Sequence, residues 1–210
     1  MTEDQGRAAF FAQIPVPRET RVKLERFADI VQDEGRIQNL IAASTLPSFW
    51  HRHMLDSAQL LSLAHPGARQ WLDVGSGAGF PGVVLAILSD DRHLLVEPRR
   101  LRANFLLSVV NELDLGDRVS VLRTRVQRVV HSAFDVITAR AFSSLAKTIE
   151  ATIHLAHRET QWLLHKGEKA AIEAADAAQT WDGKIELVPS ITDPTASIAK
   201  LGHMRRRLSR

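Results

Sequence analysis

The stretch WLDVGSGAGFPG, residues 71–82, decides the fold that the sequence predicts. An apolar run ends at Val74, four glycines follow over residues 75–82, and VVLAIL continues as an apolar run long enough to start a helix. A chain that reverses this tightly uses backbone angles that a Cβ atom would block. The stretch therefore predicts a buried strand, a glycine turn and a helix, with room for a ligand close to the backbone.

The spacing of the glycines separates two classes of cofactor. A dinucleotide fingerprint has glycine at the first, third and sixth places of the turn, but the sixth place here is Phe80. The pattern Asp-x-Gly-x-Gly-x-Gly, which begins at Asp73, is typical of methyltransferases that use S-adenosylmethionine (SAM). A tight turn that binds nothing is the alternative, although four glycines weaken a fold unless something uses the space.

Composition narrows the class of protein. The 210 residues are 45% hydrophobic and 24% charged, which suits one α/β domain with a full core. The chain has no cysteine, which excludes disulfides, thiolate metal sites and a cysteine nucleophile. No apolar run approaches the roughly 20 residues of a membrane span, and MTEDQGRAAFFAQ lacks the layout of a signal peptide. We expect a cytoplasmic protein with no membrane partner.

The basic residues are unevenly chosen. The formal net charge is only +3, but 21 of the 27 basic residues are arginine. Arginine favours phosphate because its guanidinium is a planar fork, although arginine content also follows genome composition. The chain ends in HMRRRLSR, residues 203–210, which is either a frayed basic end or an arm that contacts phosphates.

The first part of the chain, residues 1–66, is expected to form an arm and a helical cap. Residues 1–17 contain two prolines and no hydrophobic period, so they predict a loosely held arm. Helical spacing begins at Arg18 and ends near Gly35. Ser48 is a candidate N-cap for a second helix that runs from Phe49 to about Leu63.

Residues 67–210 alternate between strands and helices. Strands are predicted at 70–74, 93–96, 119–122, 134–138 and 161–165, and two further strands at 185–188 and 197–201. Helices are predicted at 81–88, 99–113, 145–155 and 168–179. This alternation implies an α/β fold whose sheet is doubly wound, mostly parallel and Rossmann-like, with right-handed crossovers.

In such sheets a ligand lies beyond the carboxyl ends of the strands. The residues expected there are the glycine turn, Glu97, residues 125–127, Arg140 and Lys166. Glu97 lies 22 residues after Gly75, near the distance that places an acid on the ribose hydroxyls. Arg140 follows the buried strand FDVIT, so it is expected to bind the carboxylate of methionine, to hold the substrate, or only to cap the strand.

With these residues in place, the chain resembles the RsmG family, also called glucose-inhibited division protein B. These bacterial methyltransferases act on N7 of one guanine in 16S ribosomal RNA. The resemblance covers roughly residues 24–167. It depends on the order and spacing of several segments, which are NL at 39–40, RHMLDS at 52–57, DVGSGAGFPG at 73–82, RRLRANFL at 99–106, FDVITARAF at 134–142 and HKG at 165–167.

The resemblance implies a class I SAM-dependent fold with SAM as cofactor. It implies that the following residues bind the cofactor: Gly75, Gly77, Phe80, Glu97, Val126, Gln127 and Arg140. The family commonly has Asp where Glu97 stands and often has Glu where Gln127 stands. In this chain Ile41 follows the NL pair, where the family usually has Thr.

The resemblance also implies how the reaction proceeds. Guanine N7 carries a free lone pair, so no general base is required and no catalytic base is named; catalysis is expected to be positioning and electrostatics. Arg140 and Lys166 are candidates to donate hydrogen bonds to O6 of the base. Arg52 and His53 are candidates to contact RNA, or else a solvated arginine and a packing histidine. The partner is 16S rRNA or the small subunit, and we expect a monomer with no metal site.

Two other functions are weighed against this interpretation. Arg99 and Arg100 could receive the 2′-phosphate of NADP in an oxidoreductase, but Phe80 in the turn and the charge of Glu97 oppose it. A non-catalytic RNA-binding module with a vestigial turn is the other possibility. The intact glycine turn, the acid and Arg140 oppose that.

Overall fold

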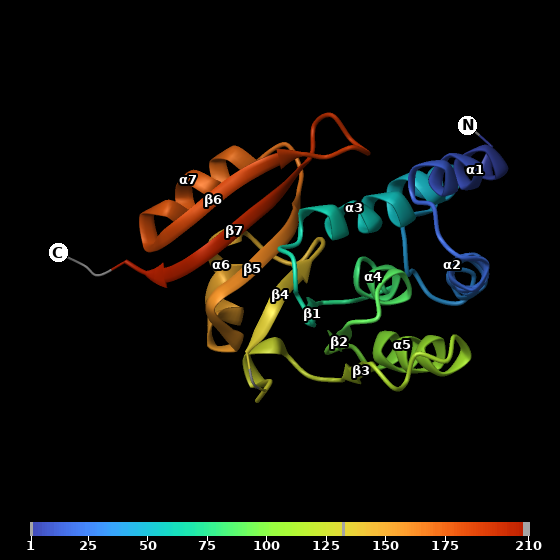
Figure 1. The fold of residues 1–210 in the computed structure, drawn as a ribbon, viewed down its shortest axis with the longest axis horizontal. Coiled ribbons are helices and arrows are strands. Elements are labelled where there is room, and N and C mark those ends of the chain that lie inside the picture. The colour runs from blue at the N-terminus through green and yellow to red at the C-terminus, as the bar shows by residue number, and fades with distance from the viewer. Residues whose placement is uncertain (1, 132, 208–210) are drawn as a thin grey trace.

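The computed structural model of the chain describes residues 2–131 and 133–207. Its centre is a seven-stranded sheet with the strand order β3-β2-β1-β4-β5-β7-β6 (Figure 1). The strands are β1 (Gln70–Val74), β2 (Arg92–Val96), β3 (Val119–Leu122), β4 (Phe134–Ala139), β5 (Ala156–Lys166), β6 (Trp181–Pro189) and β7 (Ser197–Arg206). The first five strands pair in parallel, and β7 pairs antiparallel with both β5 and β6. The predicted doubly wound, mostly parallel sheet is confirmed.

Helices cover both faces of the sheet (Figure 1). They are α1 (Glu3–Gln13), α2 (Arg18–Glu34), α3 (Asp56–Leu63), α4 (Gly82–Leu88), α5 (Arg100–Glu112), α6 (Leu145–Thr152) and α7 (Ala170–Thr180). Short helical turns are η1 (Ala43–Ser48), η2 (Trp50–Leu55), η3 (Val126–Arg128) and η4 (Ile153–Leu155). No helix of the described ranges is long and apolar enough to cross a membrane.

Alternation along the strands assigns each helix to a face. Leu72 and Val74 of β1 belong to one apolar cluster, with residues of α6 and α7. Leu95 of β2 belongs to another, with residues of α1, α2, α4 and α5. Because side chains alternate along a strand, the two clusters lie on opposite faces of the sheet. The N-terminal helices therefore extend the core on the face that α4 and α5 cover.

The expectation of a loose N-terminal arm is wrong, because α1 is a packed helix. Thr2 and Gln5 form a capping box at its start. Phe10 is 1% exposed, and its ring centroid lies 5.3 Å from that of Trp50. The helix depends on this contact with a distant segment, which explains why local periodicity did not reveal it.

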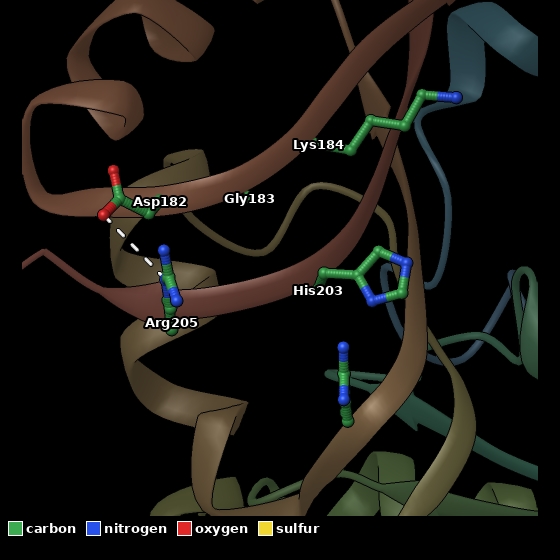
Figure 2. Close-up of a pocket in the computed structure, with 6 residues that line it drawn as sticks. Asp182, Gly183, Lys184, His203 and Arg205 are labelled. Atoms are coloured by element: carbon green, nitrogen blue, oxygen red, sulfur yellow. Dashed lines mark ion pairs between the residues drawn. The ribbon is translucent and has the colours of Figure 1, made fainter.

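The C-terminal strands are longer than predicted and close the sheet as an antiparallel hairpin. Gly183 has a φ of +150° and interrupts the pairing of β6 with β7. Beside it, side chains of both strands line a pocket of about 740 Å³ (Figure 2). Lys184 and Arg205 lie there, and Asp182 lies 4.0 Å from Arg205. Because β7 runs antiparallel to β5, this pocket lies near the N-terminal ends of the parallel strands. The glycine turn lies at their C-terminal ends. Of the predicted basic tail, residues 208–210 lie outside the described residues.

Candidate active site

The glycine turn between β1 and α4 forms the floor of the site. Gly75, Gly77 and Gly79 have φ values of +69°, +54° and +93°, a region that side chains with a Cβ rarely adopt. The turn is tied to the neighbouring strand because the Gly75 N–H donates to the Val96 carbonyl at 2.8 Å. A Cβ atom at position 75 would stand 3.0 Å from the Phe142 ring, a tight contact that adds to the positive φ in favouring glycine there.

Glu97 lies at the end of β2, where the sequence placed a ribose-binding acid. Its residue is 3% exposed, and its carboxylate accepts the N–H of Gly77 at 3.0 Å and that of Arg99 at 2.8 Å. A carboxylate offers about four lone-pair positions, so each oxygen keeps one for a ligand hydroxyl. Beyond the neighbouring strand β3, Val126 is buried and Gln127 is exposed. Glu97, Val126 and Gln127 are thus the residues at this place that could hold the nucleoside part of a cofactor such as SAM.

Phe80, the other expected cofactor residue of the turn, points into the core. Its residue is 4% exposed, and its ring lies 5.3 Å from Phe27, 5.9 Å from Phe49 and 5.1 Å from His53, centroid to centroid. The Arg140 guanidinium carbon lies 5.1 Å from the same ring centroid. Any contact of Phe80 with a ligand would therefore come from its main chain, while its ring supports His53 and Arg140.

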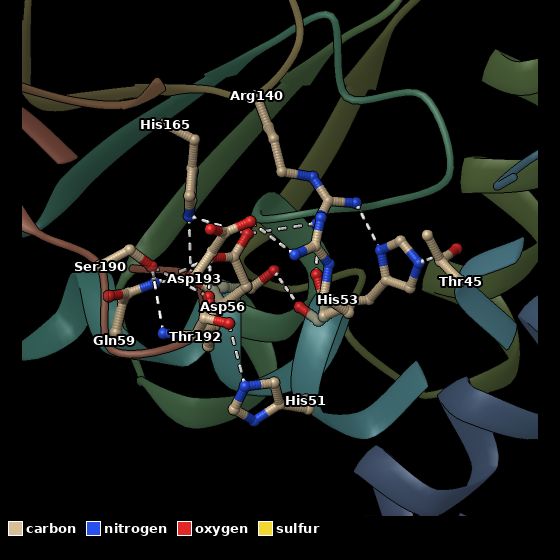
Figure 3. A network of polar contacts seen from close by, with 12 residues as sticks. Thr45, His51, His53, Asp56, Gln59, Arg140, His165, Ser190, Thr192 and Asp193 are labelled. Carbon is tan, nitrogen blue, oxygen red and sulfur yellow. Dashed lines mark hydrogen bonds and ion pairs between the residues drawn. The ribbon is translucent and has the colours of Figure 1, made fainter. Parts of the chain in front are cut away.

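Arg140 follows β4 and is held by the RHMLDS segment (Figure 3). Its Nη1 donates to the Arg52 carbonyl at 3.1 Å and lies 3.4 Å from Asp56 Oδ2, and its Nη2 donates to His53 Nδ1 at 2.9 Å. A guanidinium has five N–H groups. Among the described residues these are its three acceptors, so Nε–H and one Nη2–H remain for a ligand with an acceptor pair, such as a carboxylate.

The local helical geometry explains why one short segment supplies three acceptors. Residues 50–55 form a π-helix rather than the start of an ordinary α-helix, and no side chain caps it, so the prediction of Ser48 as N-cap is wrong. A π-helix has a wider turn. It presents the Arg52 carbonyl, the His53 ring and the Asp56 carboxylate to the same guanidinium. Such π segments occur often at functional sites.

Asp56 is the centre of this polar network, and the sequence analysis did not single it out. Besides Arg140, its Oδ1 accepts the Thr192 hydroxyl at 2.7 Å, and its carbonyl accepts His165 Nε2 at 2.8 Å. On the rim, Arg52 Nη1 donates to Asp193 Oδ2 at 2.6 Å. The RHMLDS motif contains Asp56, but its partners in the β6–β7 loop cannot be recognised from sequence spacing.

Lys166 lies at the end of β5, where the sequence placed it. Its side chain is 9% exposed, and its Nζ lies 2.9 Å from Glu173 Oε2 and donates to the Ser143 carbonyl. Glu173 also accepts the Leu145 N–H at 2.9 Å. Lys166 and Glu173 therefore hold the loop that follows Arg140, and the Lys166 ammonium has an ion partner within the chain.

A cavity of about 460 Å³ opens beside this network. Its lining includes Arg52, His53, Arg140 and Lys166, which are four of the residues that the sequence analysis named for the substrate side. It lies next to the glycine turn because Arg140 directly follows β4, the neighbour of β1. The structure thus brings the expected cofactor and substrate residues to one sheet edge.

Burial changes the charge states inside the site. Burial, with a smaller contribution from Arg140, lowers the pKa of His53 to about 3, so its ring is neutral. Burial also lowers the pKa of His165. The carboxyl of Asp73, below the glycine turn, is fully enclosed, and burial raises its pKa to about 6 although the Thr138 hydroxyl donates to it at 2.8 Å.

The chain is similar to a known family along most of its length. A family described as rRNA small subunit methyltransferase G matches residues 20–194. A ribosomal RNA small subunit methyltransferase G of Rhizorhabdus wittichii is 42% identical over 209 residues, which are 99% of this chain and 95% of that protein. One of Zymomonas mobilis is 40% identical over 212 residues, with 97% and 95% covered.

Solved structures support the fold alone, because their sequence identity is low. An O-methyltransferase from Bacillus cereus, solved in complex with SAH, has a TM-score of 0.61 at 14% identity and covers 92% of this chain and 96% of that chain. MtNAS, solved as a mutant with S-adenosylmethionine, has a TM-score of 0.58 at 17% identity, with 87% and 72% covered.

Proposed function

The chain belongs to the rRNA small subunit methyltransferase G family, and from that premise we propose that it methylates N7 of a guanine in 16S ribosomal RNA. The methyl donor is S-adenosylmethionine. The observation that carries the proposal is that three groups meet at the C-terminal ends of the strands. They are the glycine turn, the Glu97 carboxylate and the free edge of Arg140, which consists of its Nε–H and one Nη2–H. The cavity of about 460 Å³ that Arg140 lines has room for a nucleotide.

The chain's own residues bind and orient the donor. Glu97 accepts hydrogen bonds from the ribose hydroxyls, and Val126 and Gln127 contact the adenine. The free N–H groups of Arg140 bind the methionine carboxylate as a fork. When bound, SAM supplies a methyl group on a positively charged sulfur, which is a good leaving group. Gly75 and Gly77 leave their backbone open to close approach.

The target atom decides what the protein must do. Guanine N7 has a lone pair at neutral pH, so no side chain has to remove a proton, and catalysis reduces to alignment and electrostatics. An arginine fork that gripped O6 and N7 together would occupy that lone pair. We therefore propose that the two free N–H groups of Arg140 bind the methyl donor and not the guanine. Glu173 and the Ser143 carbonyl take two of the three N–H groups of Lys166, so its main role is to hold the loop after Arg140 and one N–H remains for O6.

RNA contacts are proposed on two surfaces. Arg52 lies at the cavity rim with 45% of its side chain exposed, although it pairs with Asp193. The second surface, which we call the basic groove, consists of Arg158, Lys184, His203 and Arg205 around the pocket of Figure 2. Among the described residues, Asp182 is the one acid in that lining, while Glu159 and Glu186 beside it pair with the other cations. Its cations suit RNA phosphates, and it includes the described start of the basic tail.

The RNA itself must be accessible at the target base. A base in folded RNA reaches such a cavity only if it is unpaired or turned outward. We propose that the protein acts as a monomer in the cytoplasm, where small ribosomal subunits are found.

Transfer of a tritiated methyl group from SAM tests the proposal. The purified chain is offered protein-free 16S rRNA and assembled small subunits in parallel. We expect incorporation into at least one of the two, and the preferred one identifies the natural substrate. No incorporation into either, with SAM bound normally, would contradict the proposed function and favour a non-catalytic RNA-binding module.

A further inference from the structure

His53 is one of the residues for which the sequence predicted contact with RNA, but its ring is turned inward. The residue is 7% exposed. Its ring stacks on Phe80 with 5.1 Å between centroids and 29° between planes, and it lies 5.6 Å from the Phe49 ring. Although His53 borders the cavity, a side chain packed against two aromatic rings has little surface to offer a phosphate. Its polar atoms must therefore find partners inside the protein.

Both ring nitrogens of His53 have such partners. Nδ1 lies 2.9 Å from Arg140 Nη2, and Nε2 lies 2.8 Å from the Thr45 hydroxyl oxygen. The Thr45 hydroxyl itself lies 2.7 Å from the Ala42 carbonyl, to which it donates its proton. Together these contacts form a continuous chain from the loop before the π-helix to the end of β4.

The direction of each hydrogen bond in this series follows from which groups carry protons. A hydroxyl has one proton, and that of Thr45 is given to Ala42, so its oxygen accepts from His53 Nε2–H. An arginine can only donate, so His53 Nδ1 must offer its lone pair to Arg140. The two conditions agree on one neutral tautomer. Thr45 thus keeps the acceptor nitrogen of His53 directed at Arg140.

The charges around His53 favour that neutral form. Arg140 and Arg52 oppose a positive charge on the ring, Asp56 favours one, and burial is the largest influence, so the pKa falls to about 3. A protonated ring would lose its lone pair and place a cation against Arg140. At neutral pH the ring therefore remains an acceptor.

The other contacts of Arg140 leave its Nη2 side to His53. Nη1 is held by the Arg52 carbonyl and lies 3.4 Å from Asp56 Oδ2. His53 is the acceptor recorded for Nη2 among the described residues. Without it, the guanidinium could turn about its Nη1 contacts, and the free edge that faces the donor would lose its direction.

We propose that His53 is a positioning residue of the methyl-transfer site, which accepts a hydrogen bond from Arg140 and so directs the guanidinium toward the methyl donor. The inference rests on the proposed function, because the site it serves is that of methyl transfer. In this role His53 does not contact RNA but orients Arg140. The Thr45 hydroxyl fixes the tautomer that makes the action possible.

Two variants separate this role from simple packing. In His53→Asn the amide oxygen can take the place of Nδ1 and accept from Arg140, while the contact with Thr45 is lost. In His53→Gln the amide lies near the place of Nε2, so the contact with Thr45 is kept and the acceptor for Arg140 is lost. The readouts are SAM affinity by calorimetry, single-turnover methyl transfer, RNA affinity by filter binding, and the melting temperature.

We expect His53→Gln to lose SAM affinity and transfer rate by roughly 10- to 100-fold, the range for a lost hydrogen bond to a charged group. His53→Asn should stay much closer to wild type in both, although both variants melt at a lower temperature. RNA affinity should be unchanged in both. A pH series adds a check, because the transfer rate of the wild type should show no step that belongs to His53 between pH 6 and pH 8.

Equal losses in the two variants, parallel to their melting temperatures, would overturn the inference, because that is the pattern of a packing role. Loss of RNA affinity with normal SAM affinity would overturn it in favour of RNA contact. Failure of the proposed function is distinguished by the wild type, which would then transfer no methyl group. The SAM titrations of the two variants would still decide whether His53 directs Arg140.

Discussion

Two groups of charged residues lie at opposite ends of the parallel strands and differ in their exposure and in how they are paired. At the edge with the glycine turn, the side chains of Arg140 and Asp56 are 20% and 15% exposed. In the basic groove, the side chains of Arg158, Lys184 and Arg205 are 90%, 71% and 81% exposed. The first group is bound by hydrogen bonds in a fixed geometry, whereas the second forms loose pairs in water.

The difference teaches how each region can work. Ion pairs in water contribute little and weaken with salt, whereas breaking a partly buried pair leaves a charge without its partner. The network around Arg140 is suited to orient a ligand, and its loss should be felt in the transfer step. The basic groove is suited to attract a polyanion, and its loss should be felt in affinity and salt dependence.

The largest effect is expected at Arg140. Arg140→Ala should keep the fold but lower methyl transfer by about 100- to 1,000-fold, the cost of removing an oriented donor. Single-turnover assays and SAM titration measure it. Arg140→Lys is the matched control, because it keeps the charge and loses the fork, and should recover only part of the activity. Full activity with ordinary SAM affinity in Arg140→Ala would show that Arg140 does not orient the methyl donor.

Asp56 should come next, because it holds the network together. Asp56→Ala removes the carboxylate from Arg140, His165 and Thr192. We expect the free energy of unfolding to fall by about 3 kcal/mol, as for a broken buried pair, and transfer to fall with it. Urea unfolding followed by circular dichroism gives the first value. A change below about 0.5 kcal/mol, typical of surface sites, would show that the network does not stabilise the fold.

The basic groove should give a smaller effect of a different kind. Replacing Arg158, Lys184 and Arg205 by Gln should weaken RNA binding and reduce the slope of log affinity against log salt by up to about 3, one for each lost phosphate contact. SAM affinity should not change. The matched control replaces three exposed arginines elsewhere, Arg18, Arg36 and Arg69. An equal change of slope in both triple variants would contradict a specific role for the groove.

The smallest effect tests whether burial, rather than the region, decides the behaviour of a charge. Burial lowers the pKa of His93, at the start of β2, to about 3, as it does for His53. Below pH 6.5 the unfolded chain binds protons at these rings and the native chain does not, so stability falls as pH falls. Each ring contributes a slope of up to about 1.4 kcal/mol per pH unit.

Asp73 acts in the opposite direction. Because burial raises its pKa to about 6, the native chain binds this proton below that pH, whereas the unfolded chain does so only near its ordinary value of 3.8. Between those pH values its contribution to the slope of stability against pH offsets that of about one histidine. Unfolding midpoints of wild type and His93→Gln at pH 7, 6 and 5 check the sign. A steeper loss of stability in the variant than in the wild type would contradict it.

Sequence reasoning reached the parts of the molecule that local chemistry determines. The glycine turn, the acid at Glu97 and the cation at Arg140 follow from strand ends and spacing, and the parallel sheet follows from alternation. The contact between Asp56 and Thr192 joins residues that are 136 positions apart, and nothing in local pattern predicts it. The π-helix and the packed α1 likewise depend on tertiary partners.

The same limit explains the inward position of His53. A histidine next to Arg52 on a predicted helix suggests a charged face toward RNA. Whether its ring points outward depends on Phe80 and Arg140, which the chain brings there from two other strand ends. The motif therefore identified the right segment of the site, while the role of each residue in it required the structure.

The central claim is that this sheet edge directs a methyl group to a ring nitrogen that needs no activation. Nucleoside mass analysis of 16S rRNA treated with the wild-type protein and SAM tests it most directly, because it identifies the methylated atom. The account predicts 7-methylguanosine. A methyl group found only on another atom or another base, or on no nucleoside at all, would contradict it.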